Sequence, residues 1–276
     1  MPESNLKRFY IVKEHPVRIM MKCKSHSRGT LASFLAGFCM LCIMTTWVPE
    51  ILSVFFPATN LDLFSAYTDA DPAMLKQLPA TPLVVFLYSL FFSGVFQLSE
   101  CLYTLTYIRN RKADYRALTE SFSYYVKTLA IYLIQILVIS FWTMLFIFPG
   151  IIAALNFSQS FYILADDPDK SIPEILTESK MMMYGNKMNY FRLILYYVPY
   201  YMLAYIPAML IGGLAGKVAA PVFIAAALIG DIPVFAVRGL MSMGRTVFYE
   251  LMINKGFAEF RYAGQDAFRE LEEPDR

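Results

Sequence analysis

The chain has 276 residues, of which 57% are apolar and only 17% are charged. A soluble domain of this length carries charge on about a quarter of its residues, so the composition argues against a soluble globular protein. The formal net charge of +2 is small, and we predict no nucleic-acid partner. The apolar residues are gathered in long runs, which indicate membrane spans rather than one large core.

The first 30 residues are basic and contain no apolar run, so they do not have the pattern of a cleavable signal peptide. Seven basic residues lie here: Lys7, Arg8, Lys13, Arg18, Lys22, Lys24 and Arg28. We expect a cytoplasmic leader with one of two placements. Either it lies on anionic lipid headgroups, where each basic residue contributes about 1 kcal/mol, or it is a solvated arm that only sets the topology.

The first two predicted spans cover residues 31–48 and 82–108. Trp47 and Pro49 mark the expected outer end of the first span, since tryptophan favours the membrane interface. A short amphipathic helix on the inner membrane surface should follow the second span. Its apolar face would consist of Leu118, Phe122 and Tyr125, which are spaced by four and three residues.

Residues 128–165 contain no charged side chain. One helix of this length would be about 57 Å long, nearly twice the ~30 Å hydrocarbon core of a bilayer. Pro149 and Gly150 near its middle predict a tight outer turn between two spans of about 19 residues. A re-entrant hairpin, which turns back within the membrane, would also place both ends of this segment on the cytoplasmic side. Both arrangements therefore stay open.

A second surface helix is predicted after this hairpin. Ser171 and Glu174 have the spacing of a capping box at a helix start, and Gly185 has the character of its C-terminal cap. The last two predicted spans cover residues 190–211 and 218–237. Residues 256–276 form a charged tail, which leaves 31–255 as the six-span membrane domain.

The basic residues are distributed unequally across this topology. On this division, 22 of the 24 Lys and Arg residues fall on one side, and only Lys76 and Lys217 fall on the other. Cytoplasmic loops of membrane proteins are enriched in Lys and Arg. The sequence therefore predicts a protein with both termini in the cytoplasm.

Three charged residues lie close to membrane depth: Glu100, Asp231 and Arg238. Burying one of them at the bilayer centre costs at least about 2.5 kcal/mol, so each needs a partner or water. One interpretation is a polar path or ion site that uses all three. The favoured interpretation is an interhelical ion pair of Glu100 with Arg238 near the inner surface.

No stretch carries an enzyme motif, and we predict a protein without catalytic activity, cofactor or metal. Cys39 and Cys42 have the C-x-x-C spacing, but within a span they are expected to be small packing residues. Asp166, Asp167 and Asp169 offer oxygen ligands for a divalent cation. They lack the spacing of a dedicated loop, and a solvated turn before a helix is favoured.

A possible duplication links the middle of the chain to its second half. Residues 118–121 and 176–179 both read Leu-Thr-Glu-Ser. The glutamate of the first tetrapeptide follows Gly94 by 26 residues, and that of the second follows Gly150 by 28 residues. Both tetrapeptides fall on a predicted surface helix after a span that runs from outside to inside. Parallel repeats of this kind occur in transport proteins.

The second half of the chain resembles an uncharacterised family of bacterial integral membrane proteins, a domain of unknown function. The matching residues are 148–151 (FPGI), 163–168 (ILADDP), 178–180 (ESK), 183–187 (MYGNK) and 248–251 (FYEL). The resemblance extends over roughly residues 30–255, with Ser99 where the family usually has a small glycine. It implies a multi-span helical protein of the bacterial plasma membrane and supplies no catalytic residue. A fainter likeness is to the membrane domain of some glycerophosphodiester phosphodiesterases, whose catalytic domain is absent from this sequence.

We therefore predict an all-α membrane helix bundle with six transmembrane helices and two cytoplasmic amphipathic surface helices. The expected function is that of a non-enzymatic scaffold, accessory or lipid-interacting membrane protein. Its predicted partners are the lipid bilayer and other membrane proteins. The alternative is a small transporter or channel component, suggested by the repeat and the charges at membrane depth.

Overall fold

The computed structural model describes residues 9–27, 29–56, 83–212 and 220–253, and every regular element in them is helical. The helices of the first half are α1 (Pro16–His26), α2 (Leu31–Cys42), η1 (Ile43–Trp47), α3 (Val48–Phe55), α6 (Leu83–Asn110), α7 (Arg116–Glu120), η2 (Ser121–Tyr124) and α8 (Tyr125–Leu145). Those of the second half are α9 (Ile147–Phe157), α10 (Ser160–Asp166), α11 (Ile172–Met183), α12 (Lys187–Gly212) and α13 (Ala220–Ile253). The predicted all-α class is confirmed.

Five described helical segments are long and apolar enough to cross a membrane. They are Leu31–Ser53, Leu83–Asn110, Arg116–Leu145, Ile147–Asp166 and Lys187–Ile211. The sixth predicted span corresponds to the first part of α13, and most side chains of its first turns lie outside the described residues. Residues 57–81, the predicted outer loop between the first two spans, and the tail after residue 253 lie outside them as well.

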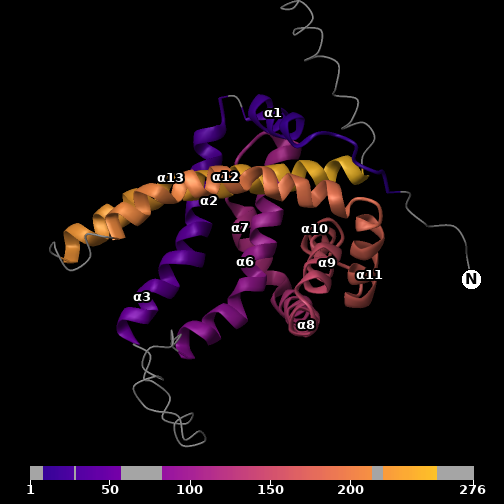
Figure 1. Ribbon diagram of the computed structural model, residues 1–276, viewed down its shortest axis with the longest axis horizontal. Helices are drawn as coiled ribbons and strands as arrows, with labels where there is room; N and C mark the ends of the chain where they lie inside the picture. Colours follow the sequence, from indigo (N-terminus) through magenta and orange to yellow (C-terminus); the bar gives the residue numbers. More distant parts are fainter. Residues whose placement is uncertain (1–8, 28, 57–82, 213–219, 254–276) are drawn as a thin grey trace, which may run out of the picture.

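The start of the first segment, the end of the second, the start of the third and the end of the fourth meet at one place, which we call the joined ends. The contacts are hydrogen bonds of Thr30 with Tyr107 (2.8 Å), Arg109 with Asp166 (2.6 Å) and Lys127 with the Lys170 carbonyl (2.7 Å). In Figure 1, α12 and α13 lie side by side across the molecule, while α2, α3 and α6 extend away from them. Successive segments therefore run toward and away from the joined ends, as a chain that crosses a membrane repeatedly would.

The first span is longer than predicted because the helix continues through Pro49. A π-helical turn, Ile43–Trp47, precedes the proline, and the Val48 N–H bonds to the Ile43 carbonyl five residues earlier. Proline in a regular helix crowds the carbonyl four residues before it, and the wider π turn relieves that crowding. The prediction that the span ends near Val48 is wrong, since helix α3 continues to Phe55.

The turn predicted at Pro149 and Gly150 lies instead at Phe146. This residue is extended (φ −156°, ψ 140°), so α8 ends before it and α9 begins after it. Pro149 falls in the first turn of α9, where a missing N–H leaves no helix hydrogen bond unmade. Gly150 serves close packing, because a Cβ atom on it would lie 2.9 Å from the Cα atom of Thr143 in α8.

The first predicted surface helix is not a separate amphipathic helix. Helix α7 has five residues and leads through the 3₁₀ turn η2 directly into α8. Leu118 is buried in α7, which packs against α6, whereas Phe122 is 46% exposed. The two side chains therefore do not form one apolar face, and that prediction is wrong.

The second surface helix is present as α11 and has the predicted caps. Glu174 accepts a hydrogen bond from the Ser171 backbone N–H at 2.9 Å, which completes one side of the capping box. This hydrogen bond holds the pKa of the Glu174 carboxyl below its usual value. Gly185 follows the helix in the left-handed region, with φ +81°, which glycine adopts without strain.

The described part of the N-terminal leader is packed against the helices, which differs from both placements expected from the sequence. Ile19 in α1 is 1% exposed, and α1 packs against α13 and α12. The Val12 N–H donates to Asn186 Oδ1 at 2.9 Å, and Asn186 Nδ2 donates to the Tyr10 carbonyl at 3.1 Å. Asn189 Nδ2 also donates to the Val12 carbonyl at 2.7 Å. These amide contacts hold a segment that the sequence predicted to be a free arm or a headgroup anchor.

Candidate functional site: a buried ion-pair cluster beside a cavity

A carboxylate and two guanidinium groups meet where α6 packs against α13. Glu100 of α6 is 8% exposed, and its two carboxylate oxygens face different arginines. Arg238 Nη2 lies 3.5 Å from Oε2, and Arg245 Nη1 lies 3.6 Å from Oε1. The seven-residue spacing of the arginines puts both on one face of α13. We call these three residues the inner cluster.

Neutral side chains from other helices complete the inner cluster. Arg238 Nη1 donates to the Thr45 hydroxyl at 2.9 Å, and Arg245 Nε donates to the Tyr190 hydroxyl at 3.0 Å. Thr45 belongs to the π turn η1, so the irregular turn in the first span supplies a hydrogen-bond acceptor to the cluster. The cluster therefore ties together α6, α12, α13 and the first span.

The structure brings together two of the three charged residues predicted at membrane depth. Glu100 and Arg238 adopt the interhelical contact considered from the sequence. Asp231 lies seven residues from Arg238, or about 10 Å along α13, and its carboxyl faces the indole of Trp47 instead. A continuous polar path through all three residues is therefore not what the structure contains. Sequence reasoning also missed Arg245, because it lies eight residues beyond the predicted end of the sixth span, whereas Arg238 follows that end directly.

A second group of charges, which we call the outer cluster, lies at the joined ends. Arg109 Nε donates to Glu250 at 2.6 Å, and its two Nη atoms donate to both Asp166 oxygens at 2.6 and 3.1 Å. The Tyr249 hydroxyl adds a hydrogen bond of 2.8 Å to Asp166. Asp166 is therefore not the solvated turn residue expected from the sequence. The sequence did not reveal this pairing, because Asp166 lies 57 residues and Glu250 lies 141 residues along the chain from their shared Arg109.

Hydroxyl groups connect the region between the two clusters. Thr246 of α13 donates to Thr104 of α6 at 2.8 Å, and its oxygen lies 3.2 Å from the Tyr162 hydroxyl of α10. Thr104 and Thr246 are fully buried and Tyr162 is 1% exposed. This chain of hydrogen bonds satisfies polar groups that would otherwise lie in an apolar interior, where an unpaired group costs about 1–3 kcal/mol.

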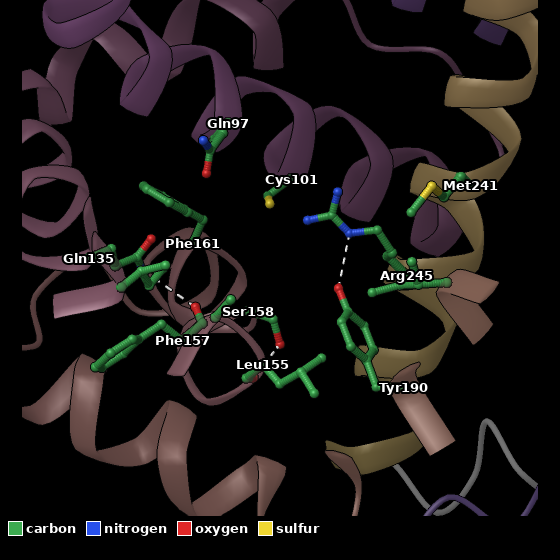
Figure 2. Close-up of a pocket in the computed structure, with 13 residues that line it drawn as sticks. Gln97, Cys101, Gln135, Leu155, Phe157, Ser158, Phe161, Tyr190, Met241 and Arg245 are labelled. Carbon is green, nitrogen blue, oxygen red and sulfur yellow. Dashed lines mark hydrogen bonds between the residues drawn. The ribbon is translucent and has the colours of Figure 1, made fainter. Parts of the chain in front are cut away.

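A cavity of about 280 Å³ lies beside the inner cluster, between α6, α8, α9, α10, α12 and α13. Figure 2 shows the Arg245 guanidinium directed into it from α13, with Tyr190 beneath and Cys101 beside it. Gln97, Gln135 and Ser158 line the walls from α6, α8 and the end of α9. The rest of the lining is largely apolar, which is the usual composition of a small-molecule site.

The two Leu-Thr-Glu-Ser segments place their serines in similar surroundings. Ser121 is fully buried and its hydroxyl contacts that of Ser99 on the preceding span. Ser179 is also fully buried and donates to the Asn156 carbonyl on its own preceding span at 2.7 Å. The matching glycines differ, because Gly94 packs against the following span and Gly150 against the preceding one. The similarity of the two segments thus extends to the surroundings of the serines and not to those of the glycines.

The candidate site contains charged and polar groups that can bind a ligand. All four cysteines are free, with Cys23, Cys42 and Cys101 buried. In the described ranges, no three His, Cys, Asp or Glu side chains gather closely enough to hold a metal ion. The polar groups that line the open volume are one guanidinium, two amides, two hydroxyls and the thiol of Cys101.

Comparison with known proteins identifies one family. A family described as a protein of unknown function (DUF975) matches residues 145–252. The match covers the segment from α9 to the end of α13, including Arg238 and Arg245, and confirms the resemblance to an uncharacterised family there. It is shorter than the expected 30–255, so residues before α9 carry no such match. No curated protein and no solved structure matches the chain.

Proposed function

We propose that this chain is a multi-pass protein of the bacterial plasma membrane that acts by binding lipid or other membrane proteins, without catalysis. On this proposal it is a scaffold, an accessory subunit or a lipid-interacting protein. Both termini and the joined ends lie in the cytoplasm. Exposed apolar side chains on the spans and basic residues at the joined ends support the proposal.

The observation that carries the proposal is that many large apolar side chains on the spans are exposed on the surface of the protein. Met144 is 91% exposed, Phe148 80%, Phe55 75% and Met209 74%. All four lie far from the joined ends, on the first, third, fourth and fifth candidate spans or their ends. A soluble monomer rarely exposes a contiguous apolar patch beyond a few hundred Å², whereas lipid tails would cover this surface at no cost.

The charges at the joined ends support the proposed orientation. Arg109, Lys127, Lys170 and Lys187 all lie there, at the inner ends predicted for four different spans. Clusters of Lys and Arg next to a span favour the cytoplasmic side. Lys170 is also paired with Glu178 at 2.7 Å; burial alone would lower the Lys170 pKa, but this ion pair and that with Asp167 raise it above its usual value.

Labelling of single introduced cysteines tests the orientation in intact cells. We expect Phe146→Cys, at the α8–α9 turn, to react with a membrane-impermeant thiol reagent added outside. Tyr184→Cys, at the end of α11 and 83% exposed, is the matched control and should react only after the cells are permeabilised. Protection of Phe146→Cys with normal Tyr184→Cys behaviour would indicate a re-entrant hairpin. Labelling of Tyr184→Cys from outside would overturn the orientation.

The binding function is tested by native mass spectrometry of the protein extracted from its own membrane in a mild detergent. We expect co-purifying protein subunits or a bound lipid at a fixed stoichiometry. The same preparation is then reconstituted alone into liposomes. Transport of a solute by the purified protein, or turnover of a lipid, would contradict the proposal.

Transport is the second candidate function, and the cavity beside Arg245 is the observation that favours it. The cavity lies between six helices and holds polar groups at membrane depth, as substrate sites of small transporters do. On this alternative, α12 and α13 would move against α6 and α8 to change access to it. Solute flux in liposomes that is lost with Arg245→Gln would favour this candidate over the first.

A further inference from the structure

We propose that the cavity beside the inner cluster binds a phosphate group, held by the guanidinium of Arg245. This inference rests on the proposed lipid-binding function and deepens it, because the phosphate of a membrane lipid headgroup is the source that the location favours. A phosphate-bearing solute would present the same chemistry. The experiment below distinguishes these two sources.

Arg245 has donor groups that no described residue satisfies. Its Nε atom donates to Tyr190, and its Nη1 atom lies 3.6 Å from Glu100, which is too long for a hydrogen bond. In the part of the chain that the structure describes, neither Nη atom has a hydrogen-bond acceptor. Figure 2 shows both of them pointing into the cavity near Cys101. A guanidinium whose two Nη atoms make no hydrogen bond to a described residue presents the fork that matches two oxygens of a phosphate.

The inner cluster also has an unbalanced charge. Glu100 supplies one negative charge to two arginines, which leaves the cluster with a net charge of +1. The outer cluster has the opposite balance, with Arg109 between two carboxylates. Its arginine lies nine residues further along α6, about 13.5 Å away, and those carboxylates are already hydrogen-bonded to it. An anion in the cavity would compensate the inner cluster directly, at a depth where an uncompensated charge is costly.

Size and position favour a headgroup over a whole lipid. A cavity of about 280 Å³ is near the lower limit of small-molecule sites, so it would admit a phosphate with a small substituent. Gln97 and Gln135 would provide amide donors on the walls opposite Arg245. Gln97 is itself exposed at the rim, as is Ala154, so the cavity opens beside surface that lipid would cover. Acyl chains would remain outside, along the exposed apolar side chains of α8 and α9.

Binding is measured by native mass spectrometry of the delipidated full-length protein in detergent, with three probes added separately. These are dioleoylphosphatidylglycerol, dioleoylglycerol, which lacks the phosphate, and inorganic phosphate. We expect one phosphatidylglycerol to bind and dioleoylglycerol not to bind. Arg245→Gln should weaken the phosphatidylglycerol affinity at least about tenfold, because it removes a charge-assisted contact. Arg192→Gln, which changes an exposed arginine of α12, is the control and should leave it unchanged.

Gln97→Leu provides a variant that does not disturb the ion pairs, and we expect a loss of affinity of about threefold. Specific binding of inorganic phosphate that needs Arg245 would assign the site to a solute instead of a lipid. Equal binding of phosphatidylglycerol and dioleoylglycerol, or binding unchanged by both Arg245→Gln and Gln97→Leu, would overturn the phosphate site. That result would leave the proposed function standing, since partner proteins or lipids bound elsewhere would still co-purify.

Discussion

Glu100→Gln should destabilise the protein by about 3–5 kcal/mol, the usual cost of removing one partner from a buried ion pair. The glutamine keeps the size of the side chain but removes the only negative charge of the inner cluster. Arg238 and Arg245 would then face one another across a neutral amide, with Thr45 and Tyr190 as their remaining hydrogen-bond partners. The expected measurement is a lower midpoint of thermal unfolding in detergent, followed by intrinsic fluorescence.

Glu120→Gln is the matched control, because Glu120 is exposed at the end of α7. A surface substitution of this kind changes stability by less than about 0.5 kcal/mol. The double variant Glu100→Gln with Arg238→Gln returns the net charge of the inner cluster to +1, its wild-type value, and should recover part of the loss. An unfolding midpoint of Glu100→Gln equal to that of the wild type would show that the two arginines do not depend on this carboxylate.

Asn186→Ala should release the N-terminal segment from the start of α12 and cost about 3–5 kcal/mol. The Asn186 side chain is 1% exposed and makes three hydrogen bonds, with Val12 N–H, the Tyr10 carbonyl and the Met182 carbonyl. Alanine would leave the buried Val12 N–H without its acceptor, at a cost of about 1–3 kcal/mol, and would remove two further bonds of about 1 kcal/mol each. The expected result is faster tryptic cleavage at Lys13 and Arg18 in the native protein.

Asn189→Ala is the graded control for this prediction. It removes one hydrogen bond to the Val12 carbonyl, which can still accept from water near the surface, so a loss of about 1 kcal/mol is expected. Cleavage at Lys13 should then be intermediate between the wild type and Asn186→Ala. If both variants resist trypsin as the wild type does, the burial of α1 against α13 holds the segment without the asparagines.

Features that depend on a few neighbouring residues were predictable. The apolar runs identified the helical segments, because each must be about 20 residues long to cross a bilayer. The caps of α11 followed from Ser171, Glu174 and Gly185, since each acts on backbone groups within one turn. The family resemblance was likewise correct over residues 145–252, where the characteristic residues are close together.

Errors occurred where packing between helices overrides local preference. Proline usually ends a helix, but the π turn before Pro49 lets the first span continue to Phe55. The break at Phe146 instead of Pro149 follows from the close contact of Gly150 with Thr143 across the turn. A proline in the first turn of a helix is as acceptable as one between helices, so local pattern could not choose between the two positions.

Composition, hydropathy and the placement of Lys and Arg were thus enough to identify an all-α chain, its candidate spans and an expected orientation. These properties come from how each residue interacts with lipid and water, which is independent of its neighbours in space. The inner cluster, the outer cluster and the docked leader were decided only by the tertiary structure. Glu100 meets Arg245, and Val12 meets Asn186, across 145 and 174 residues of chain. Contacts at that separation depend on how helices pack, which no local pattern in one sequence records.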